Sequence, residues 1–261
     1  MTSNNIQQKV REQYGKQAAR YSVSQVHATG DTLGMLVDLA ELSGAEQVLD
    51  VATGTGFCAM AFAARARRVV AYDLTPEMLA ETARLAAERG IQNLECRQGA
   101  AEDMPFPATS FDIVTSRVAP HHFASMERFM SESFRVLRPG GKLLIADTSA
   151  PDDGEADAWE NEVELLRDPS HVRDYNAAEW RSFAETAGFV DVEAGERSRT
   201  HLAFNEWVLR SGTPTGVVEH LRDMYSTASP AVVRAFGIES REGDFHWSWP
   251  VVVLRAVKPL S

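Results

Sequence analysis

Short apolar runs alternate with longer segments of helical spacing from about residue 45 onward. Runs of four to eight apolar and β-branched residues are typical of strands. Five such runs predict strands: "QVLDVA" at 47–52, "VVAYD" at 69–73, "LECRQ" at 94–98, "FDIVTS" at 111–116 and "KLLIAD" at 142–147. Strands that alternate with helices form βαβ units. The pattern therefore predicts a mostly parallel sheet with helices on both faces.

The helices predicted between these strands have recognisable ends. They cover residues 58–66, 76–89 and 125–137. Thr75 suits the N-cap of the second helix, Pro76 its first position, and Gly90 follows its end. The third helix stops at "RPGG", residues 138–141. Two further helices, at 5–20 and 32–42, are predicted before the first strand.

In the C-terminal third of the sequence, the pattern of apolar positions predicts a helical cap. A helix at 177–187 leads to a strand near 189–193, and the last strand is "PVVVLRAVKP" at 250–259. The fifty or so residues between these strands contain three amphipathic segments, "FNEWVLRSG", "TGVVEHLRDMY" and "PAVVRAF". A connection of that length is expected to carry its own structure, here a helical cap over the catalytic face.

The expected fold class is therefore α/β. It is a Rossmann-like, seven-stranded, mostly parallel sheet with N-terminal helices and a helical cap inserted before the last strand. The expected parts are an N-terminal helical cover at 1–44, a binding domain at 45–193 and 246–261, and the cap at 194–245.

The composition favours a small-molecule partner. The net charge of −11, from 37 acidic and 26 basic residues, opposes binding to nucleic acid or anionic lipid. The polar N-terminus and the charges that interrupt the apolar runs predict no signal peptide, no membrane span and a cytoplasmic location. The two cysteines are far apart and have no nearby ligand pairs, so neither a disulfide framework nor a metal site is expected.

The stretch "QVLDVATGTGFCA", residues 47–59, contains a G-x-G-x-x-A motif that begins at Gly54. A strand, a glycine-rich turn and a helix N-terminus suit a dinucleotide, and they suit S-adenosylmethionine equally well. Asp73, at the end of the second strand, accepts hydrogen bonds from ribose hydroxyls in either case. The glycine pattern therefore leaves both ligands open.

Asp50 favours S-adenosylmethionine. A carboxylate just before the turn opposes the charge of a pyrophosphate, whereas it suits a ligand with an ammonium and a sulfonium group. An alternative role for Asp50 is to cap the amides of the turn. Two alternatives for the whole chain are an NAD(P)-dependent oxidoreductase and a non-catalytic S-adenosylmethionine-binding protein.

Several linked motifs carry a family resemblance. They are "VLDVATGTG", "AYDLTPEML", "AAEDMPFPATSFDIVTSR", "HHF" and "RVLRPGGKLLIAD", in this order and spacing. Over roughly residues 10–150 the chain resembles the class I S-adenosylmethionine-dependent methyltransferases. The resemblance is to the branch that includes ubiquinone/menaquinone C-methyltransferases and many small-molecule O-methyltransferases. It implies methyl transfer to a small molecule, with S-adenosylhomocysteine as the second product.

The resemblance also implies which residues hold the donor. Asp50 and the backbone of the bend hold the methionine portion, Asp73 the ribose, and the residues after it the adenine. Beyond Asp50 and Asp73, the implied donor residues are Ala52, Gly54, Gly56, Leu74, Met78, Ala101, Glu102 and Arg117. Many relatives have glycine at the position of Ala52, so a slightly less open turn is expected here.

Three residues are candidates for the reacting end. His121 and His122 follow the fourth strand and Asp147 ends the fifth, so all three are expected in the crevice at the carboxyl ends of the sheet. A histidine can take a proton from a hydroxyl, and a carboxylate can orient it. Oxygen is therefore slightly preferred over carbon or nitrogen as the methylated atom. A structural role for the histidine pair is the alternative.

Four residues are candidates for acceptor binding. Tyr14 and Tyr21 lie at helical spacing in "QYGKQAARYS", and His171 and Arg173 lie in the turn-rich "LRDPSHVRDYN". The alternatives are an aromatic stripe that packs on the sheet and a solvated turn. An exposed apolar face of the cap would allow a homodimer.

Overall fold

The computed structural model describes residues 3–16 and 30–261. A sheet of eight strands, in the order β3-β2-β1-β4-β5-β8-β6 with β7 paired to β8, forms the centre of the described chain. The strands β1 to β5 pair in parallel, and β8 is antiparallel to β5, β6 and β7. The strands are β1 Gln47–Val51, β2 Arg68–Asp73, β3 Leu94–Gln98, β4 Phe111–Arg117, β5 Leu137–Thr148, β6 Val190–Ala203, β7 Glu239–Arg241 and β8 Asp244–Val257.

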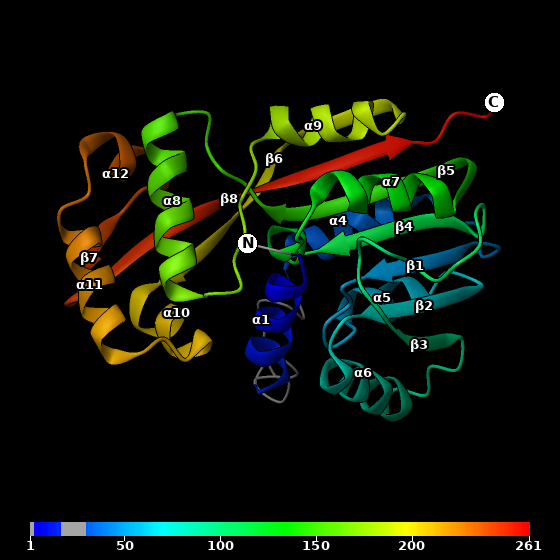
Figure 1. Ribbon diagram of the computed structural model, residues 1–261, viewed down its shortest axis with the longest axis horizontal. Helices are drawn as coiled ribbons and strands as arrows, with labels where there is room; N and C mark the ends of the chain where they lie inside the picture. The colour runs from blue at the N-terminus through cyan, green and yellow to red at the C-terminus, as the bar shows by residue number, and fades with distance from the viewer. Residues whose placement is uncertain (1–2, 17–29) are drawn as a thin grey trace.

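Helices cover both faces of the parallel strands (Figure 1). One face carries α4, α5 and α6, and the other carries α7 and α9. Their bounds are α4 Asp31–Ala40, α5 Phe57–Ala63, α6 Pro76–Glu88, α7 Met126–Val136 and α9 Ala177–Thr186. The predicted α/β class and mostly parallel sheet are confirmed, but the strand count of seven is wrong. The short strand β7 is the additional one, and it forms because a turn at 242–243 folds it back onto β8.

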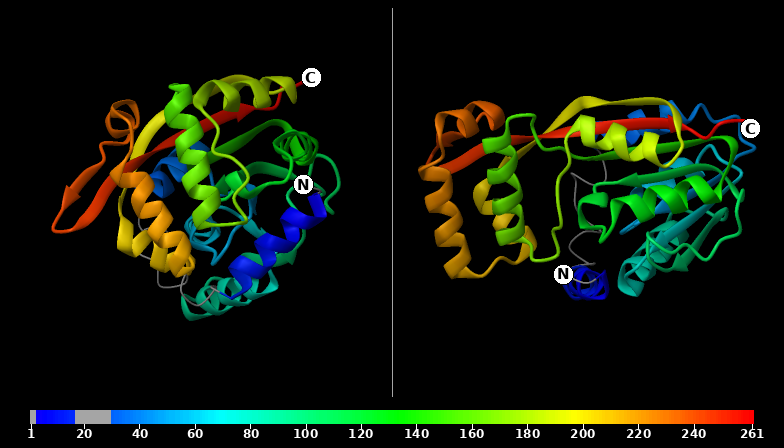
Figure 2. Two further views of the ribbon diagram at one scale, coloured as in Figure 1. Left: turned by 60° about the vertical axis from the view of Figure 1, so that its left-hand side comes forward. Right: turned by 45° about the horizontal axis from the view of Figure 1, so that its top comes forward.

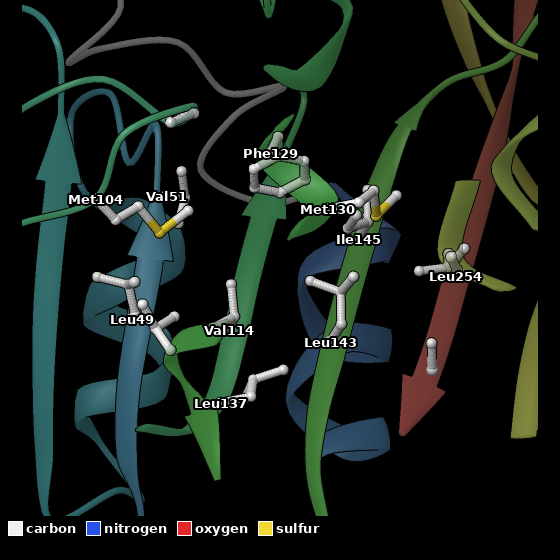
Figure 3. Packing of buried hydrophobic residues seen from close by; sticks show 14 of the residues in the cluster. Leu49, Val51, Met104, Val114, Phe129, Met130, Leu137, Leu143, Ile145 and Leu254 are labelled. Atoms are coloured by element: carbon white, nitrogen blue, oxygen red, sulfur yellow. The ribbon is translucent and has the colours of Figure 1, made fainter. Parts of the chain in front are cut away.

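Alternation along the strands divides the core between the two faces. In β1, Val48 contacts the cluster on the α4 and α5 side, whereas Leu49 and Val51 contact the α7 and α9 side. Figure 3 shows the second cluster, with Phe129 and Met130 of α7 above the strands. Because successive strand residues point to opposite faces, a buried strand must be apolar on both. This requirement explains the continuous apolar runs in the sequence.

The helices of the predicted cap are accompanied by one helix that the sequence did not predict. The predicted amphipathic segments form α10 Phe204–Ser211, α11 Thr215–Ser226 and α12 Pro230–Phe236. The sequence predicts no element for residues 151–168, yet α8 occupies Gly154–Arg167. Asp153 caps this helix by accepting from the amides of Glu155 and Ala156. Figures 1 and 2 show α8 standing beside α10, α11 and α12.

Two long strands connect the cap to the parallel sheet. β6 continues to Ala203 instead of ending near residue 193, and β8 begins at Asp244 instead of residue 250. Both strands run from the parallel sheet into the cap (Figure 2). The division of the chain into a cover, a binding domain and a cap stays a prediction.

An aromatic cluster holds the cap together. Rings from α8, α10, α11, α12 and β8 pack within about 6 Å of one another, centroid to centroid. The cluster is separate from the two clusters of the sheet. Its rings are Trp159, Phe204, Trp207, Tyr225, Phe236, Phe245, Trp247 and Trp249. Since each buried aromatic ring contributes a few kcal/mol, the cap has a core of its own.

The remaining helix, α1 Ser3–Gly15, has no buried residue. It lies between the cap and the parallel sheet in Figures 1 and 2. The helices in the described ranges include none with the length and apolar character needed to cross a membrane.

Candidate active site

A cavity of about 490 Å³ lies where the carboxyl ends of the parallel strands face the cap. Its walls come from α1, from the loops after β1, β2, β3 and β4, and from α8, β6, α10 and β8. Ligand sites of α/β sheets form at this end of the strands, where the chain order reverses. Here the reversal lies between β1 and β4.

The bend after β1 requires unusual backbone conformations. Ala52, Gly54 and Gly56 have φ angles of 54°, 56° and 83°. At Gly56 an added Cβ would lie 2.5 Å from Cγ2 of Thr82, so glycine is needed there. Ala52 is the exception, because an L-residue in the left-handed region costs about 1 kcal/mol. The bend thus keeps the conformation expected for glycine, although alanine occupies its first left-handed position.

Asp73 ties this bend to the end of β2. Its Oδ2 accepts from the Gly54 amide at 2.8 Å, and its Oδ1 accepts from the Thr75 amide at 2.8 Å. Burial raises the pKa of Asp73, while the two amides oppose that shift. Asp73 also lines the cavity, and a carboxylate oxygen can accept a second hydrogen bond. The geometry is therefore compatible with the implied ribose contact.

Asp50 lies beneath the bend and is only 1% exposed. Its Oδ2 accepts from the Thr53 hydroxyl at 2.6 Å, whereas its Oδ1 has no partner among the described residues. Burial raises the pKa of Asp50 to about 6. A buried acceptor without a partner is uncommon and is satisfied when a ligand supplies a donor. Asp50 therefore accepts from a hydroxyl of the turn, it is not among the described residues that line the cavity, and its contact with an ammonium group stays a prediction.

The other donor candidates line the same cavity, except Gly56, which lies in the bend itself. Leu74, Met78 and Ala101 provide its apolar part. Glu102 accepts from the Ala124 amide at 2.7 Å and from the Gln7 side chain at 3.2 Å, so it joins α1 to the sheet. The remaining donor candidates that line the cavity are Ala52, Gly54, Asp73 and Arg117. Nε of Arg117 donates to the Thr32 hydroxyl at 3.0 Å.

His121 and Asp147 form a buried pair beside the cavity. Nδ1 of His121 lies 2.7 Å from Oδ1 of Asp147, and the His121 amide donates to Oδ2 at 2.8 Å. Burial opposes a charge on the imidazole, but Asp147 outweighs it and raises the pKa of His121 to about 9. No residue in the described ranges bonds Nε2 of His121, which lines the cavity. This nitrogen is the one available to an acceptor.

His122 has a different role, fixed by its hydrogen bonds. Its Nδ1 lies 3.0 Å from the Ser170 carbonyl, which can only accept, so Nδ1 carries the hydrogen. Nε2 then accepts from the Tyr14 hydroxyl at 2.5 Å. Burial, with the charge of His121, lowers the pKa of His122 to about 4. His122 is therefore neutral, and both its nitrogens are bonded to the protein.

Tyr14 belongs to α1 and lines the cavity. Besides its contact with His122, its hydroxyl lies 3.4 Å from Oδ2 of Asp168. Gln13 donates to the Ser211 carbonyl at 3.0 Å and thereby joins α1 to the cap. These polar contacts, rather than burial, hold the helix over the cavity. Tyr21 lies outside the described residues, so its predicted role stays a prediction.

His171 and Arg173 lie beside His121 through their backbone. The amides of Val172 and Arg173 donate to the His121 carbonyl at 2.9 and 3.2 Å. The Arg173 side chain donates to Asp157 at 2.9 Å, whereas the His171 ring lies 5.8 Å from the His121 ring, centroid to centroid, with its Nε2 3.1 Å from Oδ1 of Asn161. Neither is among the described residues that line the cavity. The segment positions His121, and substrate binding by the two side chains stays a prediction.

Comparison with known proteins gives the family. The model of a methyltransferase domain matches residues 49–145. Over 214 residues the chain is 35% identical to the methyltransferase YcgJ of Bacillus subtilis, covering 80% of this chain and 83% of that protein. The crystal structure of YcgJ matches with a TM-score of 0.82 and 30% identity, over 87% of this chain and 98% of that one. The chain belongs to the class I S-adenosylmethionine-dependent methyltransferases.

Two further relatives match shorter parts of this chain. The protein YafE of Escherichia coli is 38% identical over 172 residues, which cover 66% of this chain and 83% of YafE. The demethylmenaquinone methyltransferase of Thermus thermophilus is 38% identical over 120 residues, which cover 45% of this chain and 54% of that enzyme. Family membership decides the question of the glycine bend, because the donor of this family is S-adenosylmethionine and not a dinucleotide.

The residues of this methyltransferase fit that donor. Bound S-adenosylmethionine supplies an electrophilic methyl group on a sulfonium. The unpartnered Oδ1 of Asp50 suits the ammonium group, Asp73 the ribose hydroxyls, and Leu74 and Met78 the adenine. Asp50 lies in β1 just before the bend, whereas Asp73 ends β2 and Leu74 and Met78 lie in the following loop and in α6.

The cap side of the methyltransferase contributes residues that sequence reasoning missed. Glu164 of α8, Trp249 of β8 and Asp174 line the cavity opposite the bend. Trp207, from the predicted cap segment "FNEWVLRSG", lines the cavity as well. A signal for α8 existed, because Asp153 precedes a run with apolar residues at helical spacing.

Proposed function

We propose that this chain transfers the methyl group to an oxygen atom of a small-molecule acceptor. The observation that supports it is that His121 lines the cavity and is held by Asp147 at 2.7 Å through Nδ1, while no described residue bonds its Nε2. A hydroxyl must lose its proton as its oxygen attacks, and a positioned base accelerates that loss. The cavity volume of about 490 Å³ and the net charge of −11 favour a small acceptor over a nucleic acid.

His121 acts as the base in this proposal. With its pKa near 9, His121 is charged at neutral pH in the empty site. Positive charge held in the neighbouring donor site lowers that pKa, because like charges disfavour each other. His121 then loses its proton, accepts the acceptor's proton at Nε2 and passes into the charged form that Asp147 stabilises.

His122 is a positioning residue in the proposed reaction. It is neutral and bonded at both nitrogens, so it does not compete with His121 for the proton. Its Nε2 orients the Tyr14 hydroxyl, and Tyr14 holds α1 over the cavity. The two residues thereby exclude water from the reacting atoms. Positioning of the donor and acceptor supplies the rest of the rate enhancement.

The test is incubation with methyl-labelled S-adenosylmethionine and a metabolite extract, followed by mass spectrometry of the labelled product. We expect an O-methyl product, which His121→Ala reduces by at least about 100-fold. The control is His220→Ala, since His220 is exposed on α11. A methyl group on nitrogen or carbon, or an undiminished rate in His121→Ala, would overturn the proposal. The homodimer and the cytoplasmic location stay predictions.

A further inference from the structure

Two indole rings form a fixed wall of the cavity on the cap side. Trp207 and Trp249 both line the cavity and are 1% and 3% exposed. Their Nε1 groups donate to the same oxygen, Oε1 of Glu164, at 3.3 and 2.7 Å. Arg167 donates to the other oxygen at 2.6 Å and lies over the Trp207 ring at 4.9 Å. The rings are therefore held in place by one buried carboxylate.

A second feature lies on the same side of His121. Asp174 lines the cavity, is 1% exposed, and its Oδ1 has no partner among the described residues. Its amide is held by Asn161 at 2.7 Å, and the preceding amide, of Arg173, donates to the His121 carbonyl. An acceptor oxygen without a partner is thus fixed within the segment that supports His121. A ligand that donates a hydrogen bond would satisfy it.

We propose that the acceptor is a planar aromatic compound with at least two hydroxyl groups. Its ring lies against Trp207 and Trp249, one hydroxyl meets His121, and another donates to Oδ1 of Asp174. This inference rests on the proposed oxygen methylation and names its substrate class. Two flat indoles favour stacking or edge contact with another ring, which adds about 0.5–1.5 kcal/mol to the burial of apolar area.

Charge favours a neutral hydroxyl over an ammonium group. The Arg167 guanidinium lines the cavity and lies over the Trp207 ring, so its positive charge repels a cationic acceptor beside that ring. His121 adds a further positive charge at the reacting end. Burial raises the pKa of Asp174 well above its usual range, although His121 opposes that shift. Burial thus disfavours the charged form of this carboxyl group, which weakens its attraction for a cation.

The experiment measures binding of probes to the enzyme saturated with S-adenosylhomocysteine, by calorimetry. The probes are 2,3-dihydroxynaphthalene, 2-naphthol, cis-1,2-cyclohexanediol and benzylamine. We expect 2,3-dihydroxynaphthalene to bind at least tenfold more tightly than 2-naphthol, which lacks one hydroxyl. The diol without an aromatic ring and the amine should bind more weakly than both. Tighter binding of benzylamine or of the diol would overturn the proposal.

Variants assign the two contacts separately. Asp174→Asn and Asp174→Ala should reduce the tenfold preference for the second hydroxyl, with the larger loss in the alanine variant. Trp249→Leu should weaken both naphthalene probes by about tenfold, while Trp249→Phe keeps a ring and should weaken them less. Glu162→Ala is the control, because Glu162 is exposed on α8. An unchanged preference in both Asp174 variants, with native melting temperatures, would contradict the role of Asp174.

Glu164 is a positioning residue for the wall. Glu164→Gln keeps an oxygen that can accept from the indoles, whereas Glu164→Ala frees both rings. We expect a shift of the tryptophan emission and at least tenfold weaker ring binding in the alanine variant, with partial rescue by glutamine. Because binding is measured without turnover, bound rings without an O-methyl product would overturn only the proposed function. Tight S-adenosylhomocysteine binding with no ring binding would overturn only this inference.

Discussion

The two halves of the cavity are built in different ways. The half that we propose for the donor, the donor half, comes from one stretch of chain between β1 and the loop after β3, with backbone amides and left-handed residues such as Gly56; the half that we propose for the acceptor is the acceptor half. The acceptor half gathers side chains from α1, α8, β6, α10 and β8. Because the members of the family share one donor, the donor half can depend on backbone geometry. The acceptor half depends on side chains, which can be exchanged without altering the sheet.

The charges of the two halves also differ. In the donor half, Asp50 and Asp73 accept from a hydroxyl and from amides. In the acceptor half, buried carboxylates pair with cations, as in His121 with Asp147 and Arg167 with Glu164. Removing one member of such a buried pair leaves an uncompensated charge. We therefore expect substitutions in the acceptor half to change turnover more than donor affinity. Substitutions at the bend should change donor affinity more than turnover.

The largest expected effect follows from Asp147→Asn. An amide cannot stabilise the charged imidazole, so we expect turnover to fall by about 1,000-fold with donor affinity changed less than about threefold. The pKa of His121 should fall from about 9 to below its ordinary 6.5, because burial then acts without the carboxylate. An NMR titration of the histidine ring signals measures this shift without an acceptor. Asp112→Asn is the control at a surface pair, and an unmoved His121 titration would contradict the prediction.

The next effect is on donor binding. Asp73→Ala removes the acceptor of the Gly54 and Thr75 amides together with the ribose contact, so affinity for S-adenosylhomocysteine should fall by about 100-fold. Calorimetric titration measures it, with Glu88→Ala on the exposed end of α6 as the control. Native affinity in Asp73→Ala would show that the bend alone holds the donor.

The pH dependence of stability tests His121 in the absence of any ligand. Its folded-state pKa of about 9 lies above the ordinary 6.5, which corresponds to at most about 3 kcal/mol of stability from the charged form. This contribution is fully present below pH 6.5 and is lost as the pH rises through 9. We expect the difference in unfolding free energy between the native chain and His121→Gln to shrink over that window. Urea unfolding between pH 6 and 9.5 measures it, and a constant difference would count against the charged pair.

The smallest effect concerns the bend. Ala52→Gly should raise the free energy of unfolding by about 0.5–1 kcal/mol, because glycine relieves the strain of the left-handed conformation. Gly54→Ala is the reverse change at a φ of 56° with no atom near the added Cβ, and it should lower stability by about 1 kcal/mol. Urea unfolding measures both changes. Destabilisation by Ala52→Gly would mean that the alanine methyl group contributes packing that outweighs the strain.

The donor half could be predicted because its information is local. The bend, Asp73 and the helix after Thr75 are short motifs whose dihedrals and caps depend on neighbouring residues. The acceptor half could not be predicted in the same way. Tyr14 and His122 are 108 positions apart, and Glu164 and Trp249 are 85 apart. No local pattern links such pairs.

The sequence by itself determined the α/β class and the placing of His121 at the carboxyl ends of the strands, since periodicity and turn chemistry act over a few residues. The glycine turn left two donors open, and the resemblance to a family indicated S-adenosylmethionine. Both histidines line the cavity, and only the tertiary structure decided that His121 keeps an Nε2 unbonded by the described residues while His122 is bonded at both nitrogens, because that depends on which partners lie within reach of each ring. It also decided that Glu164 holds two indoles as a wall. Burial and hydrogen bonding between distant segments set these choices, and they exist only once the cap has packed onto the sheet.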